Sequence, residues 1–140
     1  MINVVLLTHG EYGRGLISAA EMISGKSENL VAVPLWPDDS PESYLEKIRI
    51  ALARLDGTPE NTVLLADLFG GTPGNVAARL VCEEGFRCLT GANLPMVLEI
   101  ISTVLYAPSV DLDQLCCLGL QAGMAGLQDL ATTIRERGAQ

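Results

Sequence analysis

Four short apolar segments, separated by longer stretches with helical spacing, constrain the fold of this chain more than any other feature. They cover residues 2–7, 30–35, 62–66 and 86–90. Short, nearly continuous apolar runs are typical of strands that are buried on both faces of a parallel sheet. Four strand–helix units in succession predict an α/β protein, with an open sheet of four parallel strands and helices on both faces.

The stretches that follow these strands carry the periodicity and the end signals of helices. The first predicted helix ends at Gly25, and the second begins at a capping box formed by Asp39 and Glu42. After residue 90, Pro95 begins an almost wholly apolar helix, and Ser109 is placed to cap a further one. The sequence therefore predicts a helix after each strand and an additional helix near the end of the chain.

The segment after residue 123 is compatible with two structures. Residues 125–127 can enter an edge strand, or the segment through Ile134 can form a helix. The sequence contains no internal repeat, no low-complexity tract and no linker. Residues 1–140 are therefore expected to form a single domain, for which this is an ordinary length.

Charge and hydropathy exclude several classes of protein. The chain has 9 basic and 17 acidic residues and a net charge of −8, which argues against nucleic-acid binding because phosphate contacts need a basic surface. The first apolar run is too short for a signal sequence and lacks a basic start. Residues 97–105 fall well short of the roughly 20 apolar residues of a membrane span. We therefore expect a soluble, cytoplasmic protein.

The cysteines do not indicate a metal or redox site. Cys82, Cys88, Cys116 and Cys117 form no C-x-x-C pair, and a chain with one histidine offers no convincing set of zinc ligands. We expect all four to be reduced residues of the core, since free cysteine packs as a small apolar side chain. The glycines after the first strand do not match a dinucleotide-binding fingerprint, so no cofactor is expected.

Two polar residues follow the first and the third predicted strands. The only histidine, His9, comes after the first strand, and Asp67 comes after the third. Both would lie at the carboxyl edge of a parallel sheet, where ligands bind. A neutral imidazole offers a nucleophilic nitrogen, and a carboxylate that accepts a hydrogen bond from the other ring nitrogen fixes the tautomer. Taken alone, a histidine beside a strand is more often structural, and Asp67 equally fits a residue that caps a turn.

A glycine-rich turn follows Asp67 directly. Gly70 and Gly71 allow backbone conformations that bring amide groups close to an anion. Thr72 is predicted as the N-cap of the next helix and Pro73 as its first residue, and the N-terminus of a helix attracts phosphate. The segment by itself also fits an ordinary capped turn. Combined with His9, it points to a histidine that carries a phosphoryl group.

Three segments of the chain resemble the IIA component of the mannose family of the bacterial phosphoenolpyruvate-dependent sugar phosphotransferase system (PTS). They are residues 5–10 (VLLTHG), 66–75 (ADLFGGTPGN) and 91–99 (GANLPMVLE). They occur in the same order as in that family, with similar separations. The resemblance implies a three-layer α/β/α fold with strand order 2-1-3-4. It also implies a fifth, antiparallel edge strand around residues 126–130, exchanged between the subunits of a homodimer.

The same resemblance implies a role for each residue of the site. His9 would be phosphorylated on Nε2, and Asp67 would orient the ring through Nδ1. No metal or cofactor takes part in this chemistry. The residues implied to contact the phosphoryl oxygens are Thr8, Gly70, Gly71 and Thr72. The residues implied to wall the site are Phe69 and Pro95.

The resemblance also implies partners. The phosphoryl group would come from the phosphocarrier protein HPr and pass to a IIB component, so that the membrane components IIC and IID are reached only indirectly. One alternative is the phosphotransferase subunit that serves dihydroxyacetone kinase, whose first domain looks similar. Another is a regulatory module that binds partners according to its phosphorylation state. The segment His9-Gly10-Glu11 is also similar to histidine phosphatases, but these need an arginine in place of Thr8 and a second catalytic histidine.

Overall fold

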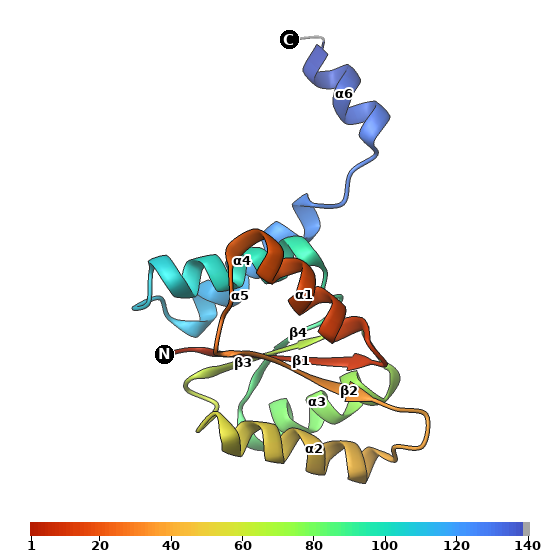
Figure 1. Cartoon of the computed structure of the whole chain (residues 1–140), viewed down its shortest axis with the longest axis vertical. Coiled ribbons are helices and arrows are strands. Elements are labelled where there is room, and N and C mark those ends of the chain that lie inside the picture. Colours follow the sequence, from red (N-terminus) through yellow and green to blue (C-terminus); the bar gives the residue numbers. More distant parts are fainter. Residues whose placement is uncertain (139–140) are drawn as a thin grey trace.

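Strands and helices alternate along most of the chain, as expected for an α/β fold (Figure 1). The computed structural model describes residues 1–138. The strands are β1 (Asn3–His9), β2 (Leu30–Leu35), β3 (Thr62–Ala66) and β4 (Arg87–Leu89). The helices are α1 (Tyr12–Ser24), α2 (Pro41–Arg54), α3 (Gly71–Glu84), α4 (Leu94–Tyr106), α5 (Leu112–Ala125) and α6 (Leu130–Gly138).

The four strands form one parallel sheet in the order β2-β1-β3-β4, which confirms the predicted strand number, direction and order. β1 extends two residues beyond the predicted strand and ends at His9, which pairs with Leu35 of β2. β4 is only three residues long, shorter than the predicted segment. Because β1 and β3 are neighbours at the centre of the sheet, the residues that follow them lie close together at one edge.

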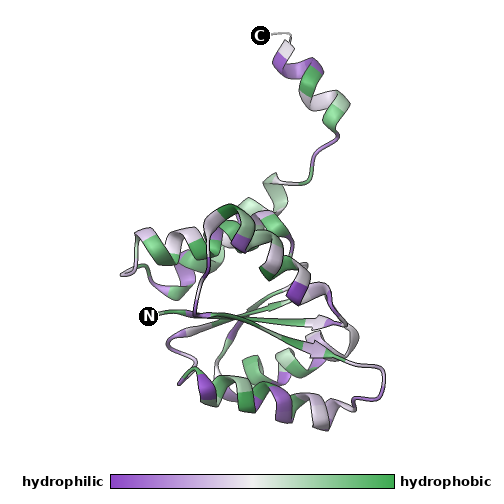
Figure 2. Cartoon of the chain, viewed as in Figure 1, coloured by the Kyte–Doolittle hydropathy of each residue, from purple (hydrophilic) through white to green (hydrophobic). Residues whose placement is uncertain are grey.

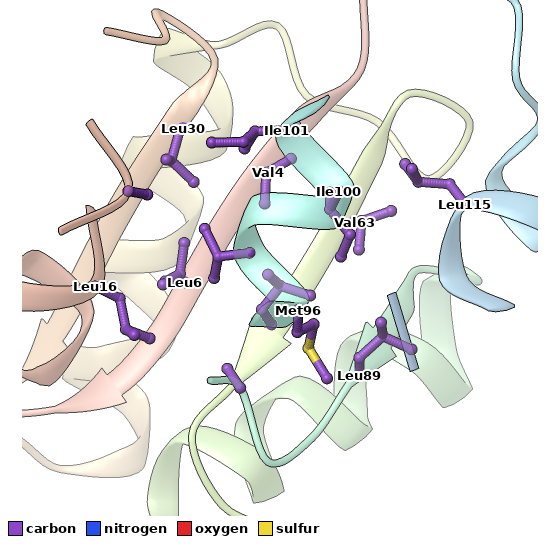
Figure 3. Packing of buried hydrophobic residues seen from close by; sticks show 14 of the residues in the cluster. Val4, Leu6, Leu16, Leu30, Val63, Leu89, Met96, Ile100, Ile101 and Leu115 are labelled. Atoms are coloured by element: carbon purple, nitrogen blue, oxygen red, sulfur yellow. The ribbon is translucent and has the colours of Figure 1, made fainter. Parts of the chain in front are cut away.

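Helices cover both faces of the sheet (Figure 1). Val4 and Leu6 of β1 pack into a core shared with α1, α4 and α5, whereas Val5 and Leu7 pack into a core shared with α2 and α3. Figure 2 shows the strands as largely hydrophobic, and Figure 3 shows side chains of β1, β3 and α4 meeting in the first core. A strand buried on both faces needs such a run, so the apolar segments located the sheet correctly.

The start of α2 differs from the prediction. Its capping box is formed by Ser40 and Ser43 and not by Asp39 and Glu42. The Ser40 N–H donates to Ser43 Oγ at 2.9 Å, and the Ser43 N–H donates to Ser40 Oγ at 3.0 Å. Asp39 instead accepts hydrogen bonds from the N–H of Trp36 in the preceding loop and from the side chains of Ser43 and Lys47. Adjacent short polar side chains have the same capping chemistry, so the sequence does not separate them.

The end of the chain is helical. The N-cap of α5 is Asp111 and not the predicted Ser109. The tail then forms α6, one of the two structures compatible with the sequence, and residues 1–138 contain no fifth strand. α6 points away from the α/β body (Figure 1) and buries none of its residues. No helix within these residues has the length and apolar character needed to cross a membrane.

The prediction that all four cysteines belong to the core is wrong for two of them. Cys82 and Cys117 are exposed, whereas Cys88 and Cys116 are half-buried. Burial raises the pKa of the Cys88 thiol to about 11, so this side chain stays protonated at neutral pH. Cys82 on α3 and Cys117 on α5 occupy outward-facing positions of amphipathic helices, where a small apolar side chain is tolerated.

Candidate functional site

His9 and Asp67 meet at the carboxyl edge of the sheet. The Nδ1 atom of His9 lies 2.8 Å from Oδ2 of Asp67, and the backbone N–H of His9 donates to the same oxygen, also at 2.8 Å. Since a carboxylate only accepts, Nδ1 carries the proton and Nε2 holds the lone pair of the neutral ring. The His9 side chain is 50% exposed and that of Asp67 only 12%. The nucleophilic nitrogen is therefore open to solvent while its acid partner is largely buried.

The second oxygen of Asp67 is unsatisfied. Oδ1 is buried and accepts no hydrogen bond from the part of the chain that the structure describes. The main-chain N–H and the Nδ1–H of His9 both donate to Oδ2. A buried carboxylate with one unpartnered oxygen favours positive charge beside it.

Gly70 and Gly71 form the turn between Asp67 and α3. Their φ angles are +91° and +69°, values that residues with a Cβ rarely adopt. A Cβ on Gly71 would lie 3.2 Å from Cε1 and 3.4 Å from Nε2 of His9. The backbone at the start of α3 is therefore directly beside the free nitrogen of the ring, and glycine leaves that space open.

The N-terminus of α3 is not capped in the way the sequence suggests. Gly70 is the N-cap and Gly71 the first helical residue, so Thr72 is not the cap and Pro73 does not begin the helix. No side chain of residues 1–138 accepts a hydrogen bond from this helix start as a cap. Its first N–H groups and the positive end of the helix dipole remain available to an anion. Gly71 thus lies beside His9, in a helix start that has no side-chain cap.

Thr8 has a different role from the predicted contact with a phosphoryl group. Its side chain is fully buried, and its Oγ1 accepts the N–H of Gly13 at 2.8 Å. Successive residues of a strand point to opposite faces of the sheet, so Thr8 faces α1 while His9 faces the other side. The Thr8 hydroxyl therefore holds the first turn of α1 and does not reach the open side of the His9 ring.

Phe69 and Pro95 are the residues predicted as walls of the site. Phe69 is 89% exposed, so its ring projects into solvent. Pro95 belongs to α4, and a Cβ on Gly126 would lie only 2.9 Å from Pro95 Cβ. The proline ring thus packs against the residue that follows α5. Phe69 remains beside the turn as an exposed apolar side chain, and Pro95 contributes to helix packing.

Tyr12 supports the site although the sequence gives no signal for it. Its hydroxyl donates to the carbonyl of Ala92 at 2.7 Å, and the N–H of Ala92 donates to the carbonyl of Ala66 at 3.0 Å. These bonds tie the start of α1 and the loop before α4 to the end of β3, next to Asp67. The two residues of the first bond are 80 positions apart, beyond the reach of any spacing rule.

Two cations, from α1 and α2, lie over Trp36, the residue that follows β2 at the same edge of the sheet. The N–H of Gly10 donates to the carbonyl of Leu35 at 2.8 Å, next to Trp36. The Arg14 guanidinium lies 5.7 Å from the centre of the Trp36 ring, and the Lys47 ammonium lies 6.0 Å from it, both within cation–π range. Residues that follow a parallel strand lie at the carboxyl edge of the sheet, and this holds for Trp36 after β2 as it does for His9. The position of Trp36 at this edge could therefore have been predicted from the sequence.

Asp39 holds the loop after β2 in place, and its titration should affect the stability of the protein. Its carboxylate accepts hydrogen bonds from Lys47 Nζ at 2.7 Å, from the Trp36 N–H at 2.9 Å and from Ser43 Oγ at 2.9 Å. These bonds, that from Lys47 foremost, lower the pKa of Asp39 to about 2. In an unfolded chain an aspartate has a pKa of about 3.9. The stabilising contribution is therefore complete above that pH and is lost as the pH falls towards 2.

We expect Asp39→Asn to flatten the acid limb of the stability profile. The free energy of unfolding, measured by urea denaturation between about pH 5 and pH 2, should fall more steeply for the wild type than for the variant. Asp38→Asn removes the same charge from the same loop and controls for net charge. Parallel curves for the wild type and Asp39→Asn would contradict a stabilised Asp39 carboxylate in the folded state.

A family model and individual relatives match this chain. The model described as the PTS system fructose IIA component matches residues 3–113, a span that includes the whole candidate site. The mannose-specific EIIAB component of Escherichia coli is 33% identical over 139 residues, which are 99% of this chain and 42% of that protein. The chain thus spans less than half the length of this relative. The fructose-specific EIIA component of Bacillus subtilis is 38% identical over 104 residues, 73% of this chain and 70% of that protein.

Solved structures share the fold. Phosphotransferase system component EIIA from Streptococcus agalactiae superimposes with a TM-score of 0.78 and 30% identity, covering 94% of this chain and 99% of that one. The mannose/sorbose-specific IIA subunit from Enterococcus faecalis has the same TM-score at 26% identity, covering 91% and 93%. Sequence and structure therefore agree: the chain belongs to the family of PTS IIA components of the mannose, fructose and sorbose type.

Proposed function

We propose that this protein is a phosphoryl carrier of the PTS, in which His9 accepts a phosphoryl group from HPr and donates it to a IIB component for sugar uptake. The observation that carries the proposal is the 2.8 Å pairing of His9 Nδ1 with the largely buried Asp67. It leaves Nε2 as the one nucleophilic nitrogen, beside the start of α3. A helix N-terminus favours phosphate.

Each transfer forms one bond and breaks one. The lone pair of His9 Nε2 attacks the phosphorus of the phosphohistidine on HPr, and the N–P bond of the donor breaks so that the donor ring keeps the electron pair. His9 retains its Nδ1 proton, and the phosphorylated ring carries a positive charge. Asp67 Oδ2 stabilises this charge through the Nδ1–H bond. The second transfer moves the phosphoryl group from Nε2 to the acceptor side chain of IIB, and His9 returns to its neutral form.

The start of α3 is suited to hold the phosphoryl oxygens. The N–H groups of Gly71 and Thr72 belong to the first turn, where no intrahelical acceptor exists. A negative group at such a position gains about 0.3–1 kcal/mol from the helix dipole. The position of Gly71 beside His9 Nε2 supports the assignment of this turn to phosphoryl binding.

The relatives support this function over the alternatives considered above. Their names assign them to mannose, fructose and sorbose systems of the PTS. No observation on residues 1–138 favours a subunit of dihydroxyacetone kinase or a purely regulatory module. The name EIIAB of the Escherichia coli protein joins a IIA and a IIB function, which supports a IIB component as the acceptor. Phosphoenolpyruvate is a cytoplasmic metabolite, so we place the activity in the cytoplasm.

Label transfer tests the proposal. The purified protein, incubated with radiolabelled phosphoenolpyruvate, enzyme I and HPr of the same organism, should take up one phosphoryl group per chain. The bond should be stable in alkali and labile in acid, as expected of a phosphohistidine. A mixture without HPr provides the blank. No uptake in the complete mixture would contradict the proposal.

We also propose that the protein forms a homodimer through its tail, as the family resemblance implies. Leu127, Leu130 and Ile134 are 76%, 71% and 60% exposed, and clustered apolar side chains of this kind are typical of surfaces that bind a partner. Light scattering should give twice the chain mass of 14.9 kDa. Truncation before Leu127 should reduce the mass to that of one chain, and a full-length monomer would refute the dimer.

A further inference from the structure

Exposed apolar side chains lie around His9 at the carboxyl edge of the sheet. We call Tyr12, Trp36, Leu68 and Phe69 the apolar rim. Phe69 is 89% exposed, Leu68 55% and Tyr12 46%, and Trp36 is half-buried. Tyr12 begins α1 after β1, Trp36 follows β2, and Leu68 and Phe69 follow β3, whose ends meet at one edge of the sheet (Figure 1). A group of exposed apolar side chains marks an interaction surface.

Short contacts place one member of the rim, Leu68, beside the His9 ring. A Cβ on Gly71 would lie 3.2 Å from His9 Cε1 and 4.0 Å from Leu68 Cδ2. The imidazole and the Leu68 side chain therefore flank the same point of the backbone, and Phe69 is the next residue of the chain. The surface next to His9 Nε2 is thus apolar on the side of Leu68.

The charges next to the rim are largely paired with one another. Arg14 and Glu11 are 3.3 Å apart, and Lys47 and Asp39 are 2.7 Å apart. The centre of a protein–protein interface is typically poor in unpaired charge and rich in aromatic side chains. The composition of the rim fits the centre of such an interface.

We propose that Phe69, supported by Leu68, is the anchor on which the donor of the phosphoryl group, a protein that presents a phosphohistidine, binds to this chain. This inference rests on the proposed function of His9. Direct transfer requires both imidazoles to reach one phosphorus atom at the same time. The donor must therefore cover the surface beside Nε2 and bury the side chains that project there. A projecting aromatic ring buried by a partner is typical of a residue that dominates binding.

The proposal distinguishes docking from chemistry, so the test uses two phosphoryl donors. Phosphorylated HPr has a protein surface, whereas potassium phosphoramidate phosphorylates histidine without one. Initial rates of His9 labelling are measured against the concentration of each donor. The variants are Phe69→Ala, Phe69→Trp and Tyr106→Ala. Tyr106, the last residue of α4, is 82% exposed. It serves as the matched aromatic control.

With phospho-HPr, Phe69→Ala should raise KM about tenfold or more and change kcat less than about twofold. Phe69→Trp should restore a KM near that of the wild type, because an indole ring offers similar apolar area. Phosphoramidate should label all variants at rates within about twofold of the wild type, because no surface has to dock. Tyr106→Ala should match the wild type with both donors.

Two results would overturn the inference. A KM of Phe69→Ala equal to that of the wild type would show that the ring does not contact the donor. An equal loss with phospho-HPr and phosphoramidate would show that Phe69 acts on the chemistry at His9 and not on docking. Wild-type protein that phosphoramidate labels but phospho-HPr does not would instead contradict the proposed function itself. The failures of the two proposals are therefore distinguishable.

Discussion

Replacement of His9 by alanine is expected to abolish phosphorylation by phosphoenolpyruvate, enzyme I and HPr. His9 is the only histidine of the chain, and its Nε2 lies beside Gly71 at the start of α3. Acid-labile label on the purified variant should not exceed the blank without HPr. Label on the variant at a level near that of the wild type would place the phosphoryl group on another residue and end the assignment.

His9→Asn is the matched control for this experiment. The asparagine amide nitrogen can take the place of Nδ1 and donate to Asp67 Oδ2, but nothing replaces Nε2. We therefore expect this variant to unfold at nearly the wild-type urea concentration while it accepts no phosphoryl group. His9→Ala leaves Asp67 with one donor fewer, and we expect it to lose about 1 kcal/mol of stability. Loss of label in a stably folded His9→Asn protein would separate chemistry from folding.

Replacement of Asp67 by asparagine should slow transfer from phospho-HPr by about a hundredfold or more. The amide preserves the shape of the side chain but removes the negative charge that favours a cationic phosphorylated ring. The amide oxygen can still accept both the main-chain N–H and the Nδ1–H of His9, so the tautomer is kept and the loss of rate measures the missing charge. Single-turnover labelling of His9 at saturating phospho-HPr measures the effect.

The structure of the Asp67→Asn protein should remain intact, since Asp67 already leaves one buried oxygen without a donor. Its urea unfolding curve, recorded beside the labelling rates, provides that control. Asp67→Ala should slow transfer to a similar degree because it also lacks the charge. Labelling rates of both variants equal to that of the wild type would remove Asp67 from the mechanism, whatever its effect on stability.

The sheet was predictable because its strands are buried on both faces. Val4, Val5, Leu6 and Leu7 alternate between two cores, so every position of the segment had to be apolar, and the run was visible without knowledge of any contact. The position of His9 and Asp67 at one edge then follows from the direction of parallel strands. Their adjacency follows from the strand order, which the family resemblance supplied.

The orientation of side chains at the strand end was harder to predict. The predicted strand stopped at Leu7, whereas β1 continues to His9. Because a strand alternates its side chains, extending it by two residues places Thr8 and His9 on opposite faces and removes Thr8 from the site. The role that the resemblance implies for Thr8 takes no account of this alternation, which buries its hydroxyl against α1.

Other errors arose where several residues offer the same local chemistry. Thr72 has the side chain of a good N-cap, but the N-cap of α3 is Gly70, which has a positive φ and no side chain to accept a hydrogen bond. Exposure of Phe69 depends on how the turn is placed in three dimensions, which its apolar neighbours in the sequence do not reveal. The contact of Tyr12 with Ala92 likewise joins distant parts of the chain. Such features are properties of the folded surface and not of any short segment.

The main-chain N–H and the ring of His9 both bind Oδ2 of Asp67. This shared contact bears on the rate of the proposed phosphoryl transfer. The torsion of the imidazole is fixed relative to the strand as soon as the chain has folded, so the nucleophile is preorganised before any partner arrives. Its rotational entropy is lost once, during folding, and not again in every encounter. A carrier that meets its donors only briefly gains most from such an arrangement, because each collision finds the reactive nitrogen already aligned.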